Sequence, residues 1–169
     1  DRATVAGLKL AFSFLLTTRG TPLIYSGDEI AMRGKADPDN RRDFPGGWAD
    51  DVQSAFTAAG RTPEQAEVHS HLAKLLQLRK ELAPLRRGNT VQLTASHTSL
   101  AFARQTAKEC VIILLNNSPQ RQLVEVPVAN LPTFARATDR LGPLGTVAVS
   151  GDRLSVMMLP RSAAVLVPD

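Results

Sequence analysis

The first part of the chain has the hydrophobic spacing of an α-helix. Val5, Leu8, Phe12 and Leu15 recur every three or four positions, and Gly20 follows as a stop signal. A stripe of this kind covers one side of a helix, while the other side stays polar. The pattern therefore predicts an amphipathic helix before residue 20.

A second helix is indicated between residues 62 and 84. Thr62 can cap its first turn, Pro63 suits the first helical position, and Gln65 completes a capping box. The predicted buried face consists of Val68, Leu72, Leu75, Leu76 and Arg79. Pro84 is the expected end of this helix.

The residues between the two helices begin with a short apolar run. Residues 22–25, Pro-Leu-Ile-Tyr, predict a strand covered on both faces, and a long polar loop follows them. The order helix, strand, loop, helix indicates an α/β layer. One strand and two helices cannot build a parallel sheet, so we expect a missing segment or self-association to supply further strands.

After Gly88 the helical period gives way to short apolar runs separated by turn residues. The runs cover residues 90–95, 99–105, 110–116, 121–128, 146–150, 153–160 and 163–168. They predict an antiparallel β-sandwich of about seven or eight strands. The predicted fold class is therefore α/β plus all-β, with domains at residues 1–88 and 89–169.

Composition excludes several classes of function. The net charge of +4 suits an anionic partner, but the basic residues are scattered, and we expect no nucleic-acid partner. The apolar stretches are shorter than the roughly 18 residues of a membrane span, so no membrane segment is expected. No signal-peptide pattern is visible, and the localisation stays open. Cys110, the single cysteine, excludes an internal disulfide and is expected to be a packed residue.

The polar loop contains side chains suited to sugar recognition. Asp37, Asn40 and Arg41 can hydrogen-bond to hydroxyl groups, and Trp48 offers an aromatic face to the apolar side of a sugar ring. The same residues could equally form a turn and a set of surface ion pairs. Both interpretations stay open on the residues alone.

Two segments resemble a known family. Residues 19–34, RGTPLIYSGDEIAMRG, and 37–48, DPDNRRDFPGGW, resemble the surroundings of the eighth barrel strand in the α-amylase family of glycoside hydrolases. Residues 71–88 resemble the eighth helix, and the β-rich remainder looks like the sandwich that follows the barrel. The loop looks most like bacterial members that act on maltooligosaccharides, cyclodextrins or pullulan.

The resemblance implies a function and a set of site residues. It implies the terminal part of a TIM (β/α)8 barrel and a retaining hydrolase or transglycosylase whose partner is an α-glucan oligosaccharide. Asp37 and Arg41 would bind the substrate, together with Trp48. Tyr25 and Glu29 would be structural residues near the site. No cofactor is expected.

The same resemblance implies that the catalytic groups lie elsewhere. Family members place a nucleophilic Asp, an acid Glu and the Asp of an Asn-His-Asp sequence after earlier strands. None of His69, His71 and His97 is followed by aspartate. We therefore expect no catalytic residue here and a parent enzyme whose N-terminal barrel segment supplies the chemistry. The alternative is a non-catalytic module that binds glucan or has only a structural role.

Three other candidate sites are not supported by the spacing. Asp28 and Glu29 are adjacent, and neighbouring residues of a strand point to opposite faces, so they should not flank one glycosidic bond. His69 and His71 diverge around a helix, and Arg41 occupies the fifth position of a potential calcium loop. No metal site is predicted.

Overall fold

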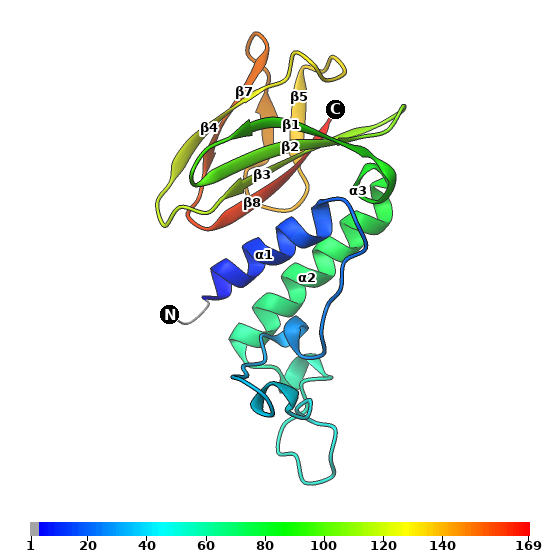
Figure 1. Ribbon diagram of the computed structural model, residues 1–169, viewed down its shortest axis with the longest axis vertical. Helices are drawn as coiled ribbons and strands as arrows, with labels where there is room; N and C mark the ends of the chain where they lie inside the picture. Colours follow the sequence, from blue (N-terminus) through cyan, green and yellow to red (C-terminus); the bar gives the residue numbers. More distant parts are fainter. Residues whose placement is uncertain (1–3) are drawn as a thin grey trace.

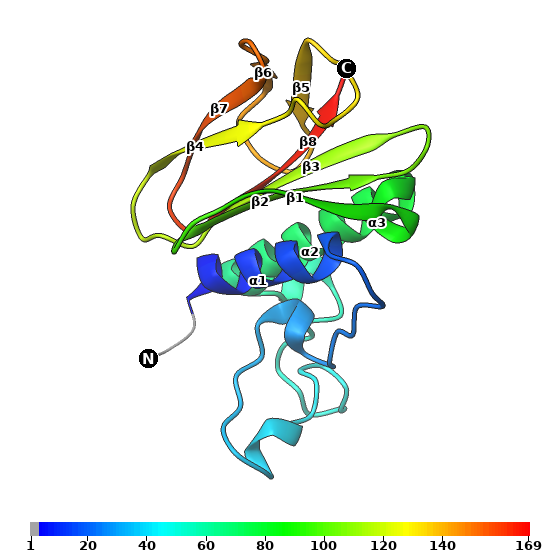
Figure 2. The same cartoon turned by 45° about the horizontal axis from the view of Figure 1, so that its top comes forward.

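The computed structural model describes residues 4–169 and arranges them in three layers. The first layer contains α1 (Val5–Thr17), α2 (Pro63–Glu81) and α3 (Ala83–Arg87). A six-stranded sheet lies on these helices, and a two-stranded sheet covers its other face (Figures 1 and 2). Residues 18–62, here called the connecting loop, join α1 to α2 and extend away from the sheets (Figure 2).

The strands confirm the predicted antiparallel sandwich. The larger sheet has the order β1-β2-β3-β8-β5-β6, and β4 pairs with β7, with every pair antiparallel. Their bounds are β1 Asn89–Ala95, β2 Ser99–Gln105, β3 Cys110–Asn116, β4 Gln122–Pro127, β5 Arg136–Asp139, β6 Thr146–Ala148, β7 Arg153–Met158 and β8 Ser162–Pro168. The strand β5 was not predicted, because four residues with two polar ends show no clear alternation.

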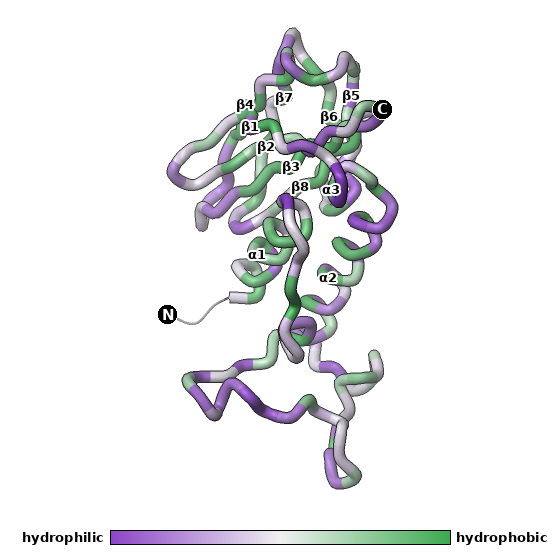
Figure 3. Tube along the Cα trace, turned by 45° about the vertical axis from the view of Figure 1, so that its right-hand side comes forward, coloured by the Kyte–Doolittle hydropathy of each residue, from purple (hydrophilic) through white to green (hydrophobic). Residues whose placement is uncertain are grey.

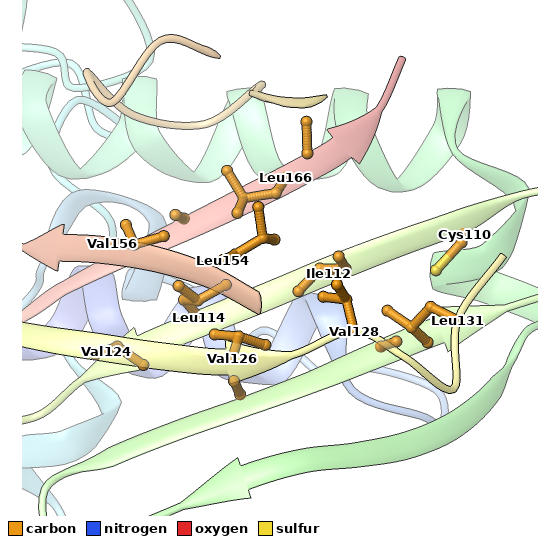
Figure 4. Close-up of a cluster of buried hydrophobic side chains, with 14 of the residues drawn as sticks. Cys110, Ile112, Leu114, Val124, Val126, Val128, Leu131, Leu154, Val156 and Leu166 are labelled. Atoms are coloured by element: carbon orange, nitrogen blue, oxygen red, sulfur yellow. The ribbon is translucent and has the colours of Figure 1, made fainter. Parts of the chain in front are cut away.

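The strand β3 is buried along its whole length because both of its faces are covered. Cys110, Ile112 and Leu114 belong to the inner core between the two sheets (Figure 4). Val111 and Ile113 belong to an outer core, which the six-stranded sheet shares with the helices. This explains why the run is continuously apolar rather than alternating.

The start of α2 follows the sequence prediction. Thr62 Oγ1 accepts a hydrogen bond from the Gln65 amide at 3.3 Å, and Gln65 Oε1 accepts one from the Thr62 amide at 2.8 Å. The buried face differs from the predicted one at its end. Leu78 is buried, whereas Leu76 is 43% exposed. The predicted place of Leu76 is wrong because the helix presents Leu75 and Leu78 to the outer core.

The first helix buries more than the predicted stripe. Phe12 is buried as expected, Leu10 and Leu16 are buried as well, and Val5 and Leu8 pack against the outer core from its edge. From the sequence, the strand predicted at residues 22–25 is the one strand these helices could cover, and this expectation is wrong, because they lie on the six-stranded sheet instead (Figure 2).

The predicted strand at residues 22–25 is also wrong. This segment is irregular, Leu23 is 75% exposed, and Tyr25 is 56% exposed. A strand needs a neighbour to receive its backbone hydrogen bonds, and within residues 4–169 no strand pairs with this segment. Leu23 and Tyr25 therefore lie on the surface, while Ile24 is half-buried against the outer core.

Two arginines tie the helix ends together, and one of them also joins the helices to the sheet. Arg79 donates from Nη1 to the Leu16 carbonyl at 2.7 Å and from Nη2 to the Gly20 carbonyl at 2.8 Å. Arg104 of β2 is 1% exposed and donates to the carbonyls of Thr17 at 3.1 Å and Gly88 at 2.7 Å. These bonds satisfy carbonyl groups at the C-terminal ends of α1 and α3.

The single cysteine is packed in the inner core. Cys110 is buried as expected, and burial raises the pKa of its thiol to about 11, so the thiol stays protonated at neutral pH.

Within residues 4–169 no helix combines the length and apolar character needed to cross a membrane.

Arg104 provides a test of the arginine contacts. We expect Arg104→Met to lower the free energy of unfolding by about 2 kcal/mol, because two carbonyl groups lose charged donors. Chemical denaturation followed by circular dichroism measures the change. Arg121→Met, at an exposed position, is the matched control and should change stability by less than about 0.5 kcal/mol. Equal stability of both variants would show that Arg104 gives no net stabilisation.

A half-buried histidine lies between α1 and α2. His71 Nε2 is 3.0 Å from Ser13 Oγ and 3.1 Å from the Lys9 carbonyl. The Ser13 hydroxyl itself donates to the Lys9 carbonyl at 2.8 Å, so Nε2 carries the proton in both contacts. Burial, and then the positive charge of Lys9, lower the pKa of His71 below its ordinary value, although Glu67 opposes this. The folded state therefore resists protonation of His71.

The lowered pKa of His71 predicts a pH-dependent stability. The unfolded chain binds a proton at higher pH than the folded chain, so stability is full above about pH 6.5 and falls as the pH drops through that value. His71→Gln should flatten the dependence of the unfolding free energy between about pH 7.5 and pH 5. His97→Gln is the matched surface variant. A wild-type slope in His71→Gln would contradict the assignment.

Candidate functional site

The connecting loop carries every site residue predicted from the sequence. Its chain is strongly hydrophilic around residues 33–43, in contrast to the sheets (Figure 3). Three short 3-10 helices organise it, η1 (Asp28–Ile30), η2 (Asp39–Arg41) and η3 (Ala58–Gly60). Turns and stretches of irregular backbone lie between them.

The carboxylates of η1 bind backbone amides. Glu29 Oε2 accepts a hydrogen bond from the Gly27 amide at 2.7 Å, and Asp28 Oδ2 accepts one from the Tyr25 amide at 3.0 Å. The premise that Asp28 and Glu29 lie on a strand is wrong, because both are in a 3-10 helix. Each carboxylate nevertheless accepts a hydrogen bond from the backbone between Tyr25 and Gly27.

Asp37 and Arg41 lie close together on the surface. Arg41 Nε is 2.8 Å from Asp37 Oδ1, and the two side chains are 71% and 63% exposed. An ion pair this exposed contributes little to stability, so exchanging it for a ligand costs little. The pair therefore presents a charged donor and acceptor that could bind neighbouring hydroxyl groups.

A second ion pair lies beside the first. Asp39 Oδ1 accepts a hydrogen bond from Arg42 Nε at 2.7 Å and contacts Arg42 Nη2, while Asp39 Oδ2 accepts one from the Lys35 amide at 2.8 Å. The hydrogen bonds from Arg42 and then from Lys35 lower the pKa of Asp39. The sequence alone does not reveal which arginine Asp39 binds.

Trp48 is displayed on a separate turn of the connecting loop. Its side chain is 64% exposed, and Asp51 Oδ2 accepts hydrogen bonds from the amides of Trp48 at 3.1 Å and Gly46 at 2.7 Å. Within residues 4–169 no hydrogen bond or ion pair links Trp48 to Asp37 or Arg41. The structure thus holds the indole in the solvent without joining it to the ion pair.

An open hollow lies beside the Asp39–Arg42 pair. Its volume is about 610 Å³, and it separates the start of α1 from the loop and from the first turn of α2. Asp39, Arg42 and Glu64 line it, and Glu64 pairs with Arg33 at 3.0 Å. Among residues 4–169 no group of three or more His, Cys, Asp or Glu side chains could hold a metal ion.

Comparisons with known proteins identify relatives of this architecture. Cyclomaltodextrinase of Geobacillus thermopakistaniensis is 33% identical over 126 residues, which cover 73% of this chain and 19% of that protein. Neopullulanase 2 of Thermoactinomyces vulgaris is 36% identical over 133 residues, covering 76% of this chain and 20% of that protein. No family model matches the sequence.

A solved structure shows the same fold. The α-amylase of Geobacillus thermoleovorans, complexed with acarbose, has a TM-score of 0.78 and 29% identity over 96% of this chain and 33% of that chain. The resemblance to the α-amylase family of glycoside hydrolases is thereby confirmed, and so is the fold class. The chain spans about a fifth of the length of the two curated relatives.

The exposure of Trp48 can be tested directly because it is the single tryptophan. We expect the fluorescence of the chain to be that of a water-exposed indole and to be readily quenched by acrylamide. Asp51→Ala should increase the quenching, because the turn loses both amide contacts. Asp50→Ala, at the neighbouring exposed position, is the matched control. Strong protection from acrylamide in the unaltered chain would show that Trp48 is covered.

Proposed function

We propose that this chain forms part of the glucan-binding face of an α-amylase-family glycoside hydrolase or transglycosylase and contributes no catalytic carboxylate. The observation that carries this proposal is the exposed Asp37–Arg41 pair on the connecting loop. The names of the relatives, cyclomaltodextrinase and neopullulanase, support a glucan as substrate.

The chemistry of the ion pair fits this role. A sugar hydroxyl both donates and accepts, so it can bridge a carboxylate and a guanidinium group. Asp37 and Arg41 would each exchange part of their mutual contact for such a hydroxyl. Trp48 would offer its ring to the apolar face of a glucose unit, and Tyr25 and Glu29 would maintain the turn at the start of the loop.

We further propose that a separate barrel segment covers the connecting loop and supplies the nucleophile, the acid and the stabilising aspartate. The exposed large apolar side chains of the loop support this. They are Leu23, Tyr25, Trp48, Val52 and Phe56, all more than half exposed. Such surface is favourable to bury, at about 25 cal/mol per Å². In this arrangement residues 1–88 complete the barrel, and residues 89–169 form the following domain.

Turnover of maltohexaose tests the proposal. The isolated chain should not release reducing sugar, whereas the chain combined with the barrel segment of the parent enzyme should. In the active assembly, Asp37→Ala and Arg41→Ala should each raise the Michaelis constant for maltohexaose about fivefold, since an exposed charged contact contributes up to about 1 kcal/mol. The value for a short activated glucoside should change less.

The outcomes separate the possible roles. Hydrolysis by the purified chain alone would refute the absence of catalytic groups. Equal losses on long and short substrates would indicate a folding defect and would support surface ion pairs instead. Binding of maltohexaose by the chain, measured by titration calorimetry, with no activity in any assembly would favour the non-catalytic glucan-binding module.

A further inference from the structure

The side chain of Asp39 closes a hydrogen-bonded ring with the backbone of residues 35–39 in the connecting loop. Its Oδ2 accepts a hydrogen bond from the Lys35 amide at 2.8 Å, and its Oδ1 accepts one from Arg42 Nε at 2.7 Å. Lys35 and Arg42 are the two ends of the segment that contains Asp37 and Arg41. The Asp39 side chain therefore holds the backbone at Lys35 and the guanidinium group of Arg42.

A close backbone approach marks the same closure. A Cβ atom placed on Gly34 would lie 2.8 Å from Asn40 Cα and 3.0 Å from the Asp39 carbonyl, so there is no space for a side chain. The Asp39 amide also donates to the Ala36 carbonyl at 3.0 Å. The loop thus returns on itself at Gly34 and Asn40.

The ring also affects how the charged side chains of the candidate site pair with one another. Two aspartates and two arginines lie within residues 37–42, and either arginine could pair with either acid. Arg42 is engaged by Asp39, which leaves Arg41 with Asp37 as its partner. Losing Asp39 would leave both arginines competing for Asp37.

We propose that Asp39 is a positioning residue that selects the Asp37–Arg41 pairing for glucan binding without touching the glucan itself. The proposal rests on the proposed function of that pair. Asp39 would act through the geometry of the ring and through its hold on Arg42. Its side chain is about one-third exposed, whereas those of Asp37 and Arg41 are more than half exposed. This difference supports separate roles for the two acids.

The geometry is tested first on the chain alone. Asp39→Asn and Gly34→Ala should each speed amide hydrogen exchange at Lys35 and Arg41, measured by NMR, because the first weakens the ring and the second forces Gly34 and Asn40 apart. Asp43→Asn is the matched control, since its carboxylate makes no hydrogen bond with any described residue. Unchanged exchange in Asp39→Asn would overturn the proposal.

The consequence for binding is tested in the active assembly. Asp39→Asn and Gly34→Ala should each raise the Michaelis constant for maltohexaose about two- to fivefold, with kcat and the constants for a short activated glucoside unchanged. Asp43→Asn should match the unaltered enzyme. Faster exchange without a change in the Michaelis constant would refute positioning, even where Asp37→Ala weakens binding and the proposed function holds. If Asp37→Ala has no effect, the proposed function fails and the role of Asp39 fails with it.

Discussion

The burial of β3 on both faces is the constraint on which the rest of the structure depends. One set of its side chains fills the space between the sheets, and the alternate set contacts the helices. Because a strand places successive residues on opposite faces, a shift of one residue would exchange the two sets. The strand therefore fixes the position of the helical layer, and with it both ends of the connecting loop.

The connecting loop is held by a different kind of interaction. Few of its residues are buried, Ile30 and Ala55 among them, and its turns are held by backbone–backbone hydrogen bonds and by carboxylates that accept hydrogen bonds from backbone amides. Such bonds span a few residues and do not depend on a large core. This allows a charged surface to stay ordered at a distance from the sheets.

The sequence was most informative where local chemistry decides the structure. The capping box at Thr62 and the apolar runs of the sandwich are signals within a few residues, and both predicted the structure correctly. The exposed segment 22–25 has the composition of a strand, but a strand also requires a neighbour, which its own residues cannot reveal. The long-range contacts of Arg104 were hidden for the same reason, since they join residues 87 and 16 positions apart.

The candidate site was predictable to a similar degree. Sequence reasoning singled out Asp37, Arg41 and Trp48, and the structure shows how each is displayed, while their role in binding stays a prediction. Which aspartate pairs with which arginine could not be predicted, because two aspartates and two arginines within six residues allow more than one pairing. Only the path of the backbone decides between them.

The shared outer core limits how this architecture can be recombined. Gly88 looks like a natural crossover point, since it lies between the helices and the first strand of the sandwich. A chimera joined there would place foreign helices on Val111, Ile113 and Val165, which share the outer core with α1 and α2. Interiors tolerate changes of volume poorly, so such a graft would need compensating substitutions on the sheet. In a chimera, the sandwich and its helices are therefore best exchanged together.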